Sequence, residues 1–173
     1  ELAAKPLGLI GYGRIGRAVG RLARAFGMDV QAWTRTPRPE EGCRMVSREE
    51  LFATSDVISL HCPLTEENRG LINRETIRQM KDGVILLNTA RGPLVVERDL
   101  REALDGGKVY AAGVDVASTE PIGLDNPLLG APNCLITPHI AWATRAARQR
   151  LMDTAVENLR HFLEGQPVNR VDR

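Results

Sequence analysis

Three side chains in the second half of the sequence are of the types that act on a small hydroxy acid: Arg91, Glu120 and His139. An arginine at a strand end binds a carboxylate through two parallel hydrogen bonds, and a histidine exchanges a hydroxyl proton while a hydride moves. A glutamate near that histidine orients the imidazole and stabilises its protonated form. Each residue also has an ordinary structural explanation, as a surface charge, a solvated loop acid or a capping group. Whether these residues are catalytic or only structural therefore depends on where the predicted strands and helices place them.

The glycines near the start of the chain, Gly11, Gly13 and Gly16, form the pattern G-x-G-x-x-G. An apolar run at residues 7–10 precedes them and apolar residues at helical spacing follow as far as Phe26, which predicts a strand, a tight turn and a helix. The first glycine permits the turn, the second lets a pyrophosphate approach the backbone, and the third lets the helix pack closely. The same glycines could separate a strand from a helix and bind nothing, but the flanking elements favour a dinucleotide.

Five further strands share short apolar runs that end in polar, glycine or proline residues: residues 28–33, 57–61, 84–88, 109–116 and 134–136. Helices are predicted between them and after them: from the N-cap Ser47 through Phe52, around Ile77 and Met80, from Leu94 to Leu104, and over residues 143–164. Residues 117–133 are predicted to be a loop with at most one helical turn, around Leu128. This alternation predicts an α/β fold, a doubly wound parallel sheet of the Rossmann type in three layers.

Ligands bind such a sheet at the carboxyl ends of its strands, so the residues found there are the candidates for a site. They are residues 11–13, 34–36, 61–63 and 88–91, Asp115, and residues 137–139. Arg91 and His139 are both among them.

The order and spacing of these motifs resemble the D-isomer-specific 2-hydroxyacid dehydrogenases. The resemblance covers nearly the whole chain and rests on the glycine pattern, Asn88-Thr89-Ala90-Arg91-Gly92, Gly113-Val114-Asp115-Val116 with Glu120-Pro121, and Thr137-Pro138-His139-Ile140-Ala141. Within the family, the chain most resembles the branch of glycerate dehydrogenases and hydroxypyruvate or glyoxylate reductases. This resemblance rests on Asp125-Asn126-Pro127-Leu128 and Ile140-Ala141-Trp142-Ala143-Thr144. The formate dehydrogenase branch carries an amide where this chain has Glu120, which disfavours it.

The resemblance implies a role for each matched residue. Arg91 would bind the substrate carboxylate and orient the carbonyl, His139 would donate the proton, and Glu120 would pair with His139. Besides the glycines Gly11, Gly13 and Gly16, the implied cofactor contacts are Arg14 and Ile15 at the pyrophosphate, Cys62 and Pro63 along the adenosine, Thr89 and Ala90 beside the nicotinamide, Asp115 at its carboxamide, and Ala141 just beyond the histidine.

The end of the second predicted strand departs from the family pattern. An acidic residue usually binds the adenine ribose there, whereas this chain has Thr34 followed by Arg35. Loss of the carboxylate removes the repulsion of a 2′-phosphate, and Arg35, with Thr36 and Arg38, could bind one. We therefore expect NADP to be accepted at least as well as NAD. The alternative is that Arg35 is only a solvated turn residue.

The chain, residues 1–173, is expected to be the coenzyme domain alone. It starts without an initiator Met and only a few residues before its first strand, whereas in the family a substrate domain precedes the glycine motif. The chain should therefore bind cofactor but turn over substrate poorly or not at all, because the cleft that closes over the substrate is absent. The resemblance also implies a homodimer for the longer enzyme.

Composition excludes several other classes of function. The formal net charge of +1 gives no reason to expect nucleic acid as a partner, and no apolar run reaches the roughly 18 residues of a membrane span. Cys43, Cys62 and Cys134 lack metal-ligand spacing, so we expect no metal and reduced thiols in a cytoplasmic protein. A non-catalytic dinucleotide sensor, like the transcriptional corepressors that resemble this family, remains the alternative function.

Overall fold

The computed structural model describes residues 1–37 and 40–171. The chain divides into two compact units, Glu1–Pro138 and His139–Arg173, and each is described by itself. Arg38, which was expected to help bind a 2′-phosphate, lies outside the described residues.

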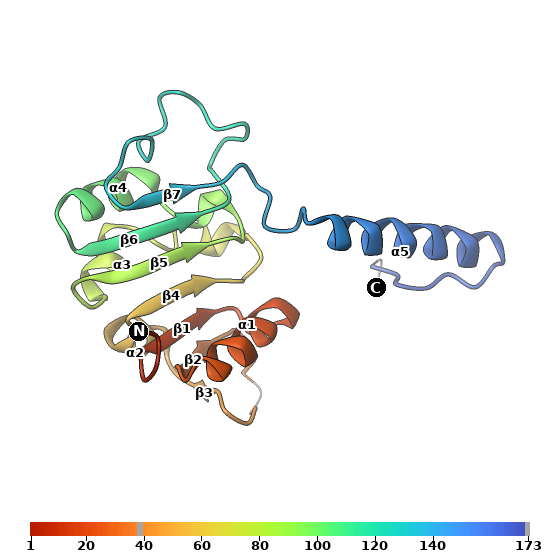
Figure 1. The fold of residues 1–173 in the computed structure, drawn as a ribbon, viewed down its shortest axis with the longest axis horizontal. Helices are drawn as coiled ribbons and strands as arrows, with labels where there is room; N and C mark the ends of the chain where they lie inside the picture. Colours follow the sequence, from red (N-terminus) through yellow and green to blue (C-terminus); the bar gives the residue numbers. More distant parts are fainter. Residues whose placement is uncertain (38–39, 172–173) are drawn as a thin grey trace. The chain divides into compact units, whose positions relative to one another are not determined.

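The first unit contains a seven-stranded sheet in which all neighbouring strands run parallel (Figure 1). The strands are β1 Pro6–Ile10, β2 Asp29–Trp33, β3 Arg44–Met45, β4 Val57–Leu60, β5 Val84–Asn88, β6 Val109–Val114 and β7 Cys134–Ile136. Their order is β3-β2-β1-β4-β5-β6-β7, so the sheet grows in one direction from β1 to β3 and in the other from β4 to β7. The predicted doubly wound parallel sheet is confirmed, and its switch point lies between β1 and β4.

β3 was not predicted. It has only two residues and pairs with β2 alone, Gln31 opposite Arg44 and Ala32 opposite Met45. A strand this short carries no apolar run, so no periodicity in the sequence could reveal it.

The helices of the first unit cover both faces of the sheet. They are α1 Arg14–Ala25, α2 Arg48–Thr54, α3 Arg74–Gln79 and α4 Glu97–Asp105, with short 3-10 helices at Glu66–Asn68 and Gly92–Leu94. The predicted N-cap of α2 is confirmed, because the Ser47 side chain accepts a hydrogen bond from the Glu50 amide at 3.0 Å.

One helix boundary was predicted wrongly. The helix expected from Leu94 to Leu104 begins only at Glu97. The Leu94 carbonyl accepts from the Ile72 amide at 2.9 Å, and the Val96 amide donates to the Ile72 carbonyl at 2.8 Å. These bonds hold Val95 extended beside Ile72, between the 3-10 helix Gly92–Leu94 and α4, so tertiary pairing overrides the helical spacing of the leucines.

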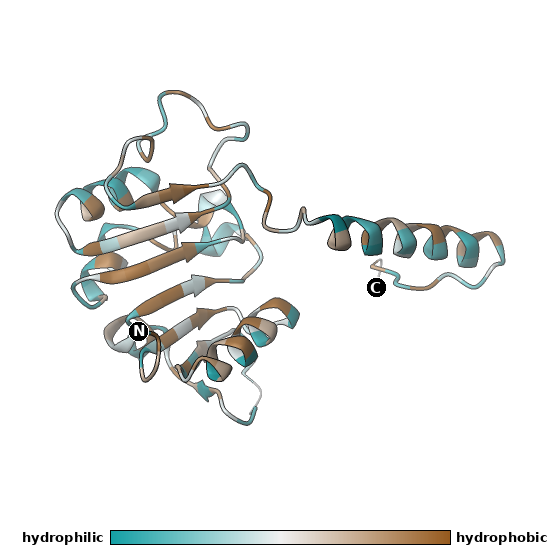
Figure 2. Ribbon diagram, viewed as in Figure 1, coloured by the Kyte–Doolittle hydropathy of each residue, from teal (hydrophilic) through white to brown (hydrophobic). Residues whose placement is uncertain are grey.

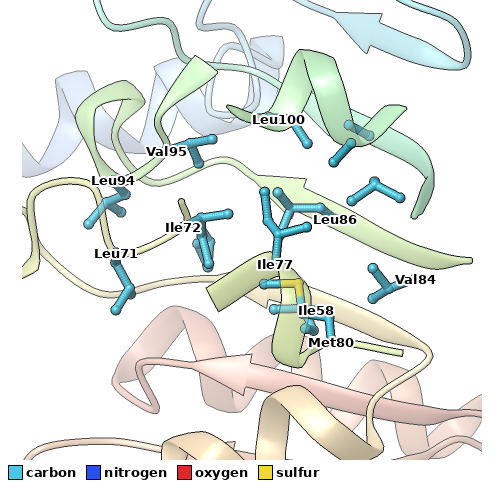
Figure 3. Close-up of a cluster of buried hydrophobic side chains, with 14 of the residues drawn as sticks. Ile58, Leu71, Ile72, Ile77, Met80, Val84, Leu86, Leu94, Val95 and Leu100 are labelled. Carbon is cyan, nitrogen blue, oxygen red and sulfur yellow. The ribbon is translucent and has the colours of Figure 1, made fainter. Parts of the chain in front are cut away.

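The core lies on the two faces of the sheet. On one face, apolar residues of β4 and β5 pack against those of α2, α3 and α4, and Figure 3 shows Ile58, Leu86, Ile77 and Leu100 in this cluster. A smaller cluster on β1 and β2 packs against α1. Figure 2 shows the strands as mostly hydrophobic and the helices as two-sided, as expected for a sheet buried between helices. This packing holds the strand ends that carry the candidate site.

The second unit contains α5, Arg145–Leu163, within the predicted residues 143–164. Thr144 caps it, because its hydroxyl accepts from the Ala147 amide at 3.2 Å. Its apolar side chains, Leu151, Leu159 and Phe162 among them, are exposed in this chain. Over residues 1–37 and 40–171, no helix combines the length and the apolar character that crossing a membrane requires.

Candidate cofactor-binding site

Gly11 makes the turn from β1 to α1 directly against the end of β4. Its φ is +93°, and a Cβ at this position would lie 2.6 Å from the Cys62 nitrogen. The Gly11 amide donates to the Trp33 carbonyl at 2.9 Å, which ties the turn to the end of β2 as well. Only glycine has both the required backbone angle and the required size here. The turn therefore sits at the switch point of the sheet.

Gly13 and Gly16 differ in what surrounds them. A Cβ on Gly16 would lie 2.3 Å from the Gly11 carbonyl oxygen, so α1 can start this close to the turn only with glycine at that position. A Cβ on Gly13 would meet nothing within 4 Å. Gly13 is the N-cap of α1 and provides no side-chain cap for the amides of the first turn. Open space in front of an uncapped helix N-terminus suits a phosphate group.

We expect Gly16→Ala to lose cofactor binding. The added methyl group would force α1 away from the turn, raising the dissociation constant for NADPH about tenfold or more and lowering the free energy of unfolding by about 1–3 kcal/mol. Calorimetric titration and thermal unfolding measure the two effects. Gly13→Ala is the matched control, because its Cβ meets open space. Its free energy of unfolding should equal that of the unchanged chain, whereas its NADPH binding should be weaker than that of the unchanged chain. Unaltered NADPH binding by Gly16→Ala would contradict the assignment of this turn.

A cavity of about 670 Å³ opens beside the glycine turn. Its walls come from the turn, the end of β2, the start of α2 and the segment after β4, and they are Gly11, Tyr12, Gly13, Trp33, Thr34, Arg35, Thr36, Arg48, His61, Cys62, Pro63, Thr65, Glu67, Asn68 and Leu71. The structure thus brings together the residues predicted for the adenosine side with two of the three glycines. Arg14, Ile15 and Gly16 follow at the start of α1.

Two charged residues of this cavity, Arg48 and Glu67, were not predicted from the sequence. The Arg48 guanidinium carbon lies 6.0 Å from the centroid of the Trp33 ring, and Arg48 donates to Glu49 at 3.3 Å. Glu67 is exposed on another wall; hydrogen bonding by Thr65 is the main cause that lowers the pKa of its carboxyl, and the charge of Arg35 acts in the same direction. Only the parallel pairing of β3 with β2 brings the start of α2 to this edge, so no local signal could place Arg48 here.

His61 and Cys62 provide uncharged groups at the end of β4. Burial lowers the pKa of the His61 imidazole, so the ring is neutral at neutral pH, and its Nε2 lies 3.0 Å from the Ser59 hydroxyl. Burial also raises the pKa of the Cys62 thiol, which therefore stays protonated. His61 and Cys62 thus add no negative charge to the wall of the cavity.

Tyr12, between the first two glycines, connects the turn to the segment after β2. Its side chain is buried, its hydroxyl lies 3.5 Å from a Glu40 oxygen, and the Arg17 guanidinium carbon lies 5.8 Å from its ring centroid. Arg17 and Glu40 form an ion pair at 2.9 Å. Tyr12, the second residue of the glycine pattern, therefore has a structural role.

A second group of candidates lies at the ends of β5 and β6. The buried Asn88 side chain accepts from the Ala90 amide at 3.1 Å and donates to the Arg91 carbonyl at 2.9 Å, which fixes the turn around Thr89. The Arg91 side chain is exposed and donates to the Ala90 carbonyl at 2.6 Å. A rigid turn thus presents a guanidinium to solvent, as binding a carboxylate requires.

Asp115 follows β6 and is buried, with its Oδ1 accepting from the Thr137 hydroxyl at 2.5 Å. Farther along, a Cβ on Gly92 would lie 1.9 Å from the Ala117 carbonyl oxygen, so the turn that carries Arg91 lies against the start of the loop that carries Glu120. The Glu120 carboxylate accepts from the Ala117 amide at 3.2 Å.

His139 and Ala141 belong to the second unit. His139 is half-buried, has a φ of +55°, and its carbonyl accepts from the Trp142 indole nitrogen at 3.0 Å. The pairing of Glu120 with His139 stays a prediction.

The family follows from comparison with known proteins. Residues 1–141 match the model of the NAD-binding domain of D-isomer-specific 2-hydroxyacid dehydrogenases. The chain belongs to this family. Its fold and its glycine turn are those of a dinucleotide-binding domain, and the resemblance stated from the sequence is confirmed.

Named relatives act on related small acids. The chain is 58% identical over 176 residues to a hydroxypyruvate reductase of Blautia hydrogenotrophica, with 100% of this chain and 55% of that protein covered. It is 42% identical over 174 residues to a glycerate dehydrogenase of Methylorubrum extorquens, covering 99% and 54%. The solved structure of the TT0316 protein from Thermus thermophilus matches with a TM-score of 0.93 at 50% identity, covering 98% and 54%. The chain thus spans about half the length of these relatives.

Proposed function

We propose that this chain is the coenzyme domain of an enzyme that transfers a hydride between NAD(P)H and a small D-2-hydroxy acid or 2-keto acid, with hydroxypyruvate, glyoxylate or glycerate as substrate. The observation that carries the proposal is the glycine turn at the switch point, open to solvent at Gly13 and continuous with a cavity of about 670 Å³. The substrate class is supported by the relatives named hydroxypyruvate reductase and glycerate dehydrogenase.

The residues present fit a dinucleotide. The uncapped start of α1 and the open space at Gly13 suit the pyrophosphate, and the walls around Thr34 and Cys62 suit the adenosine. Thr89 and Ala90, on the turn fixed by Asn88, are assigned to the nicotinamide side. The bound cofactor supplies the hydride that C2 of the acid accepts, or takes it up in the reverse direction.

The protein's own groups then bind the acid and move the proton. The Arg91 guanidinium binds the substrate carboxylate and orients the carbonyl. In reduction, His139 donates a proton to the carbonyl oxygen, which becomes the hydroxyl group, and in oxidation it takes the same proton back. Glu120 orients the imidazole and stabilises its protonated form. Arg91 and Glu120 come from adjoining segments of the first unit, which meet where Gly92 contacts Ala117.

A chimera tests the catalytic proposal. In it, this chain replaces the matching half of the Blautia hydroxypyruvate reductase, to which it is 58% identical. The chimera should oxidise NADPH when hydroxypyruvate or glyoxylate is added. If it binds NADPH but reduces neither acid, the non-catalytic sensor is the better description. By itself the chain is expected to bind cofactor with little or no turnover.

We also propose that NADP is the preferred cofactor. Thr34 stands where a ribose-binding carboxylate would repel a 2′-phosphate, and Arg35 and Arg48 line the same cavity. The exposed Glu67 is the one acidic residue among the described walls of this cavity.

Arg35→Ala should remove the preference for NADPH. Loss of a charge-assisted hydrogen bond to the 2′-phosphate, about 1.5–3 kcal/mol, should weaken NADPH binding by a factor on the order of 10 to 100 and leave NADH binding nearly unchanged. Calorimetric titration of the chain with each cofactor measures the ratio. Arg98→Ala, at an exposed arginine of α4, is the charge-matched control and should keep the ratio. An Arg35→Ala variant that still prefers NADPH would contradict the role of this residue.

We further propose a cytoplasmic homodimer for the enzyme. Ile15, Leu22 and Phe26 leave apolar side chains exposed along α1, which suits a contact between subunits. The cysteines Cys43, Cys62 and Cys134 are free thiols, as in the reducing cytoplasm. Light scattering of the chimera measures the mass, and a monomer at micromolar concentration would contradict the dimer.

A further inference from the structure

One carboxylate outside the assigned residues binds three donors of the loop that carries Glu120. Glu97 is the first residue of α4. Its Oε1 accepts from the Ser118 amide at 2.8 Å, and its Oε2 accepts from the Ser118 hydroxyl at 2.6 Å and from the Asn126 side-chain amide at 3.0 Å. Both oxygens of a single side chain thus connect α4 to two points of the loop that are eight residues apart in sequence.

These contacts differ from an ordinary surface ion pair. All three donors are neutral, and one of them is a backbone amide whose direction is set by the chain, so the contacts define a geometry and not only an attraction. Glu97 also lies in the first turn of α4, where the positive end of the helix dipole favours a carboxylate. α4 packs against the core through Leu100, Ala103 and Leu104, so it is a rigid support for the loop.

The loop needs such a support. Residues 117–133 contain no helix or strand, and Ser118, Glu120 and Leu124 are exposed. By contacting Ser118 and Asn126, Glu97 closes the segment between them, and Glu120 lies two residues after the first contact. The Ala117 amide, next to Ser118, is the donor that binds the Glu120 carboxylate at 3.2 Å.

We propose that Glu97 is a positioning residue: it holds residues 118–126 against α4 and thereby fixes the direction in which Glu120 presents its carboxylate. The catalytic consequence rests on the proposed function, because it assumes that Glu120 orients the imidazole of His139. The support of the loop by Glu97 does not depend on that assumption.

Amide hydrogen exchange on the chain itself tests the support. In Glu97→Ala, exchange at the Ala117 and Ser118 amides should become faster by a factor on the order of 10 or more, while the amides of β5 keep their protection. Glu97→Gln keeps one accepting oxygen and should give an intermediate rate. Glu102→Gln is the matched control, since it removes the same charge from the same helix but from a side chain that binds Arg74. Unchanged exchange in Glu97→Ala would overturn the proposal.

Kinetics of the chimera test the consequence for catalysis. Because misplacement of a catalytic group by about 1 Å costs on the order of 100-fold, Glu97→Ala should lower kcat by a factor of about 10 to 100 while the NADPH dissociation constant changes less than about twofold. Glu97→Gln should recover part of the loss, whereas a general loss of fold would lower cofactor binding as well. Glu102→Gln should have the same kcat as the chimera without substitutions.

A double-mutant cycle with Ser118→Ala tests whether Glu97 affects kcat through its hydrogen bonds to Ser118. Because Ser118 and Glu97 share hydrogen bonds, the changes in kcat should be non-additive, with Ser118→Ala adding little in the Glu97→Ala background. Additive effects would overturn the proposal. If the unchanged chimera reduces no keto acid, the proposed function fails, and the exchange measurement alone then decides whether Glu97 supports the loop.

Discussion

His139→Ala should slow the reduction of hydroxypyruvate by the chimera, lowering kcat by a factor on the order of 100 to 10,000. The rate falls because no other group then delivers the proton to the carbonyl oxygen. The size of the loss is the usual contribution of a positioned general acid. In the sequence His139 lies three residues after the end of β7 at Ile136, and it has a φ of +55°, a backbone conformation that is uncommon for residues other than glycine.

Stopped-flow measurement of NADPH oxidation gives the rate, and calorimetry gives the cofactor affinity, which should stay within about twofold because the proposed role of the imidazole is to contact the acid and not the dinucleotide. His161→Ala, in α5 of the same unit, is the matched control and should retain full activity. A His139→Ala variant with the activity of the unchanged chimera would refute the assignment of the proton donor.

Arg91→Ala should abolish most of the activity while leaving cofactor binding intact. In the closed enzyme the proposed pair of Arg91 and the substrate carboxylate is shielded from water, and removal of one partner of such a pair costs about 2–5 kcal/mol, which corresponds to a factor on the order of 30 to 5,000 in kcat/KM for the keto acid. Arg91→Lys keeps the charge but loses the two parallel hydrogen bonds, so it should recover only a small part of the activity. The fold should be unaffected, because the Arg91 side chain is exposed and the turn is held by Asn88.

Steady-state kinetics with hydroxypyruvate measure this loss, and thermal unfolding tests that the fold is retained. Arg78→Ala, at an exposed arginine of α3, removes the same charge from a surface helix and serves as the control. If Arg91→Ala kept KM and kcat for hydroxypyruvate, the substrate carboxylate would have to bind elsewhere and the proposed site would be wrong.

Much of the fold could be predicted from the sequence because most of its strands are short apolar runs that end in polar, glycine or proline residues. Residues 84–88 and 134–136 were predicted with the bounds that β5 and β7 have in the structure. The local signal failed where tertiary contacts set the structure. β3 depends on pairing with Gln31 and Ala32, and Val95 is held extended by Ile72.

Some residues of the candidate site could likewise be predicted from the sequence, and others could not. The strand ends that line the cavity, from Gly11 to Pro63, could be predicted because parallel strands place their carboxyl ends at one edge. Arg48 could not, since its place in the cavity depends on the unpredicted β3. Glu97 could not either, because its partner Ser118 is 21 residues away and nothing between them indicates the contact. The roles of Arg91, Glu120 and His139 stay predictions.

Calorimetric titration of the unmodified chain with NADPH, followed by NADH, tests the central proposal most directly. It measures whether the glycine turn and the cavity beside it bind a dinucleotide without any further part of an enzyme. We expect saturable binding of one NADPH per chain and weaker binding of NADH. If neither cofactor binds while the chain is folded, the proposal that this unit forms a cofactor site by itself is contradicted.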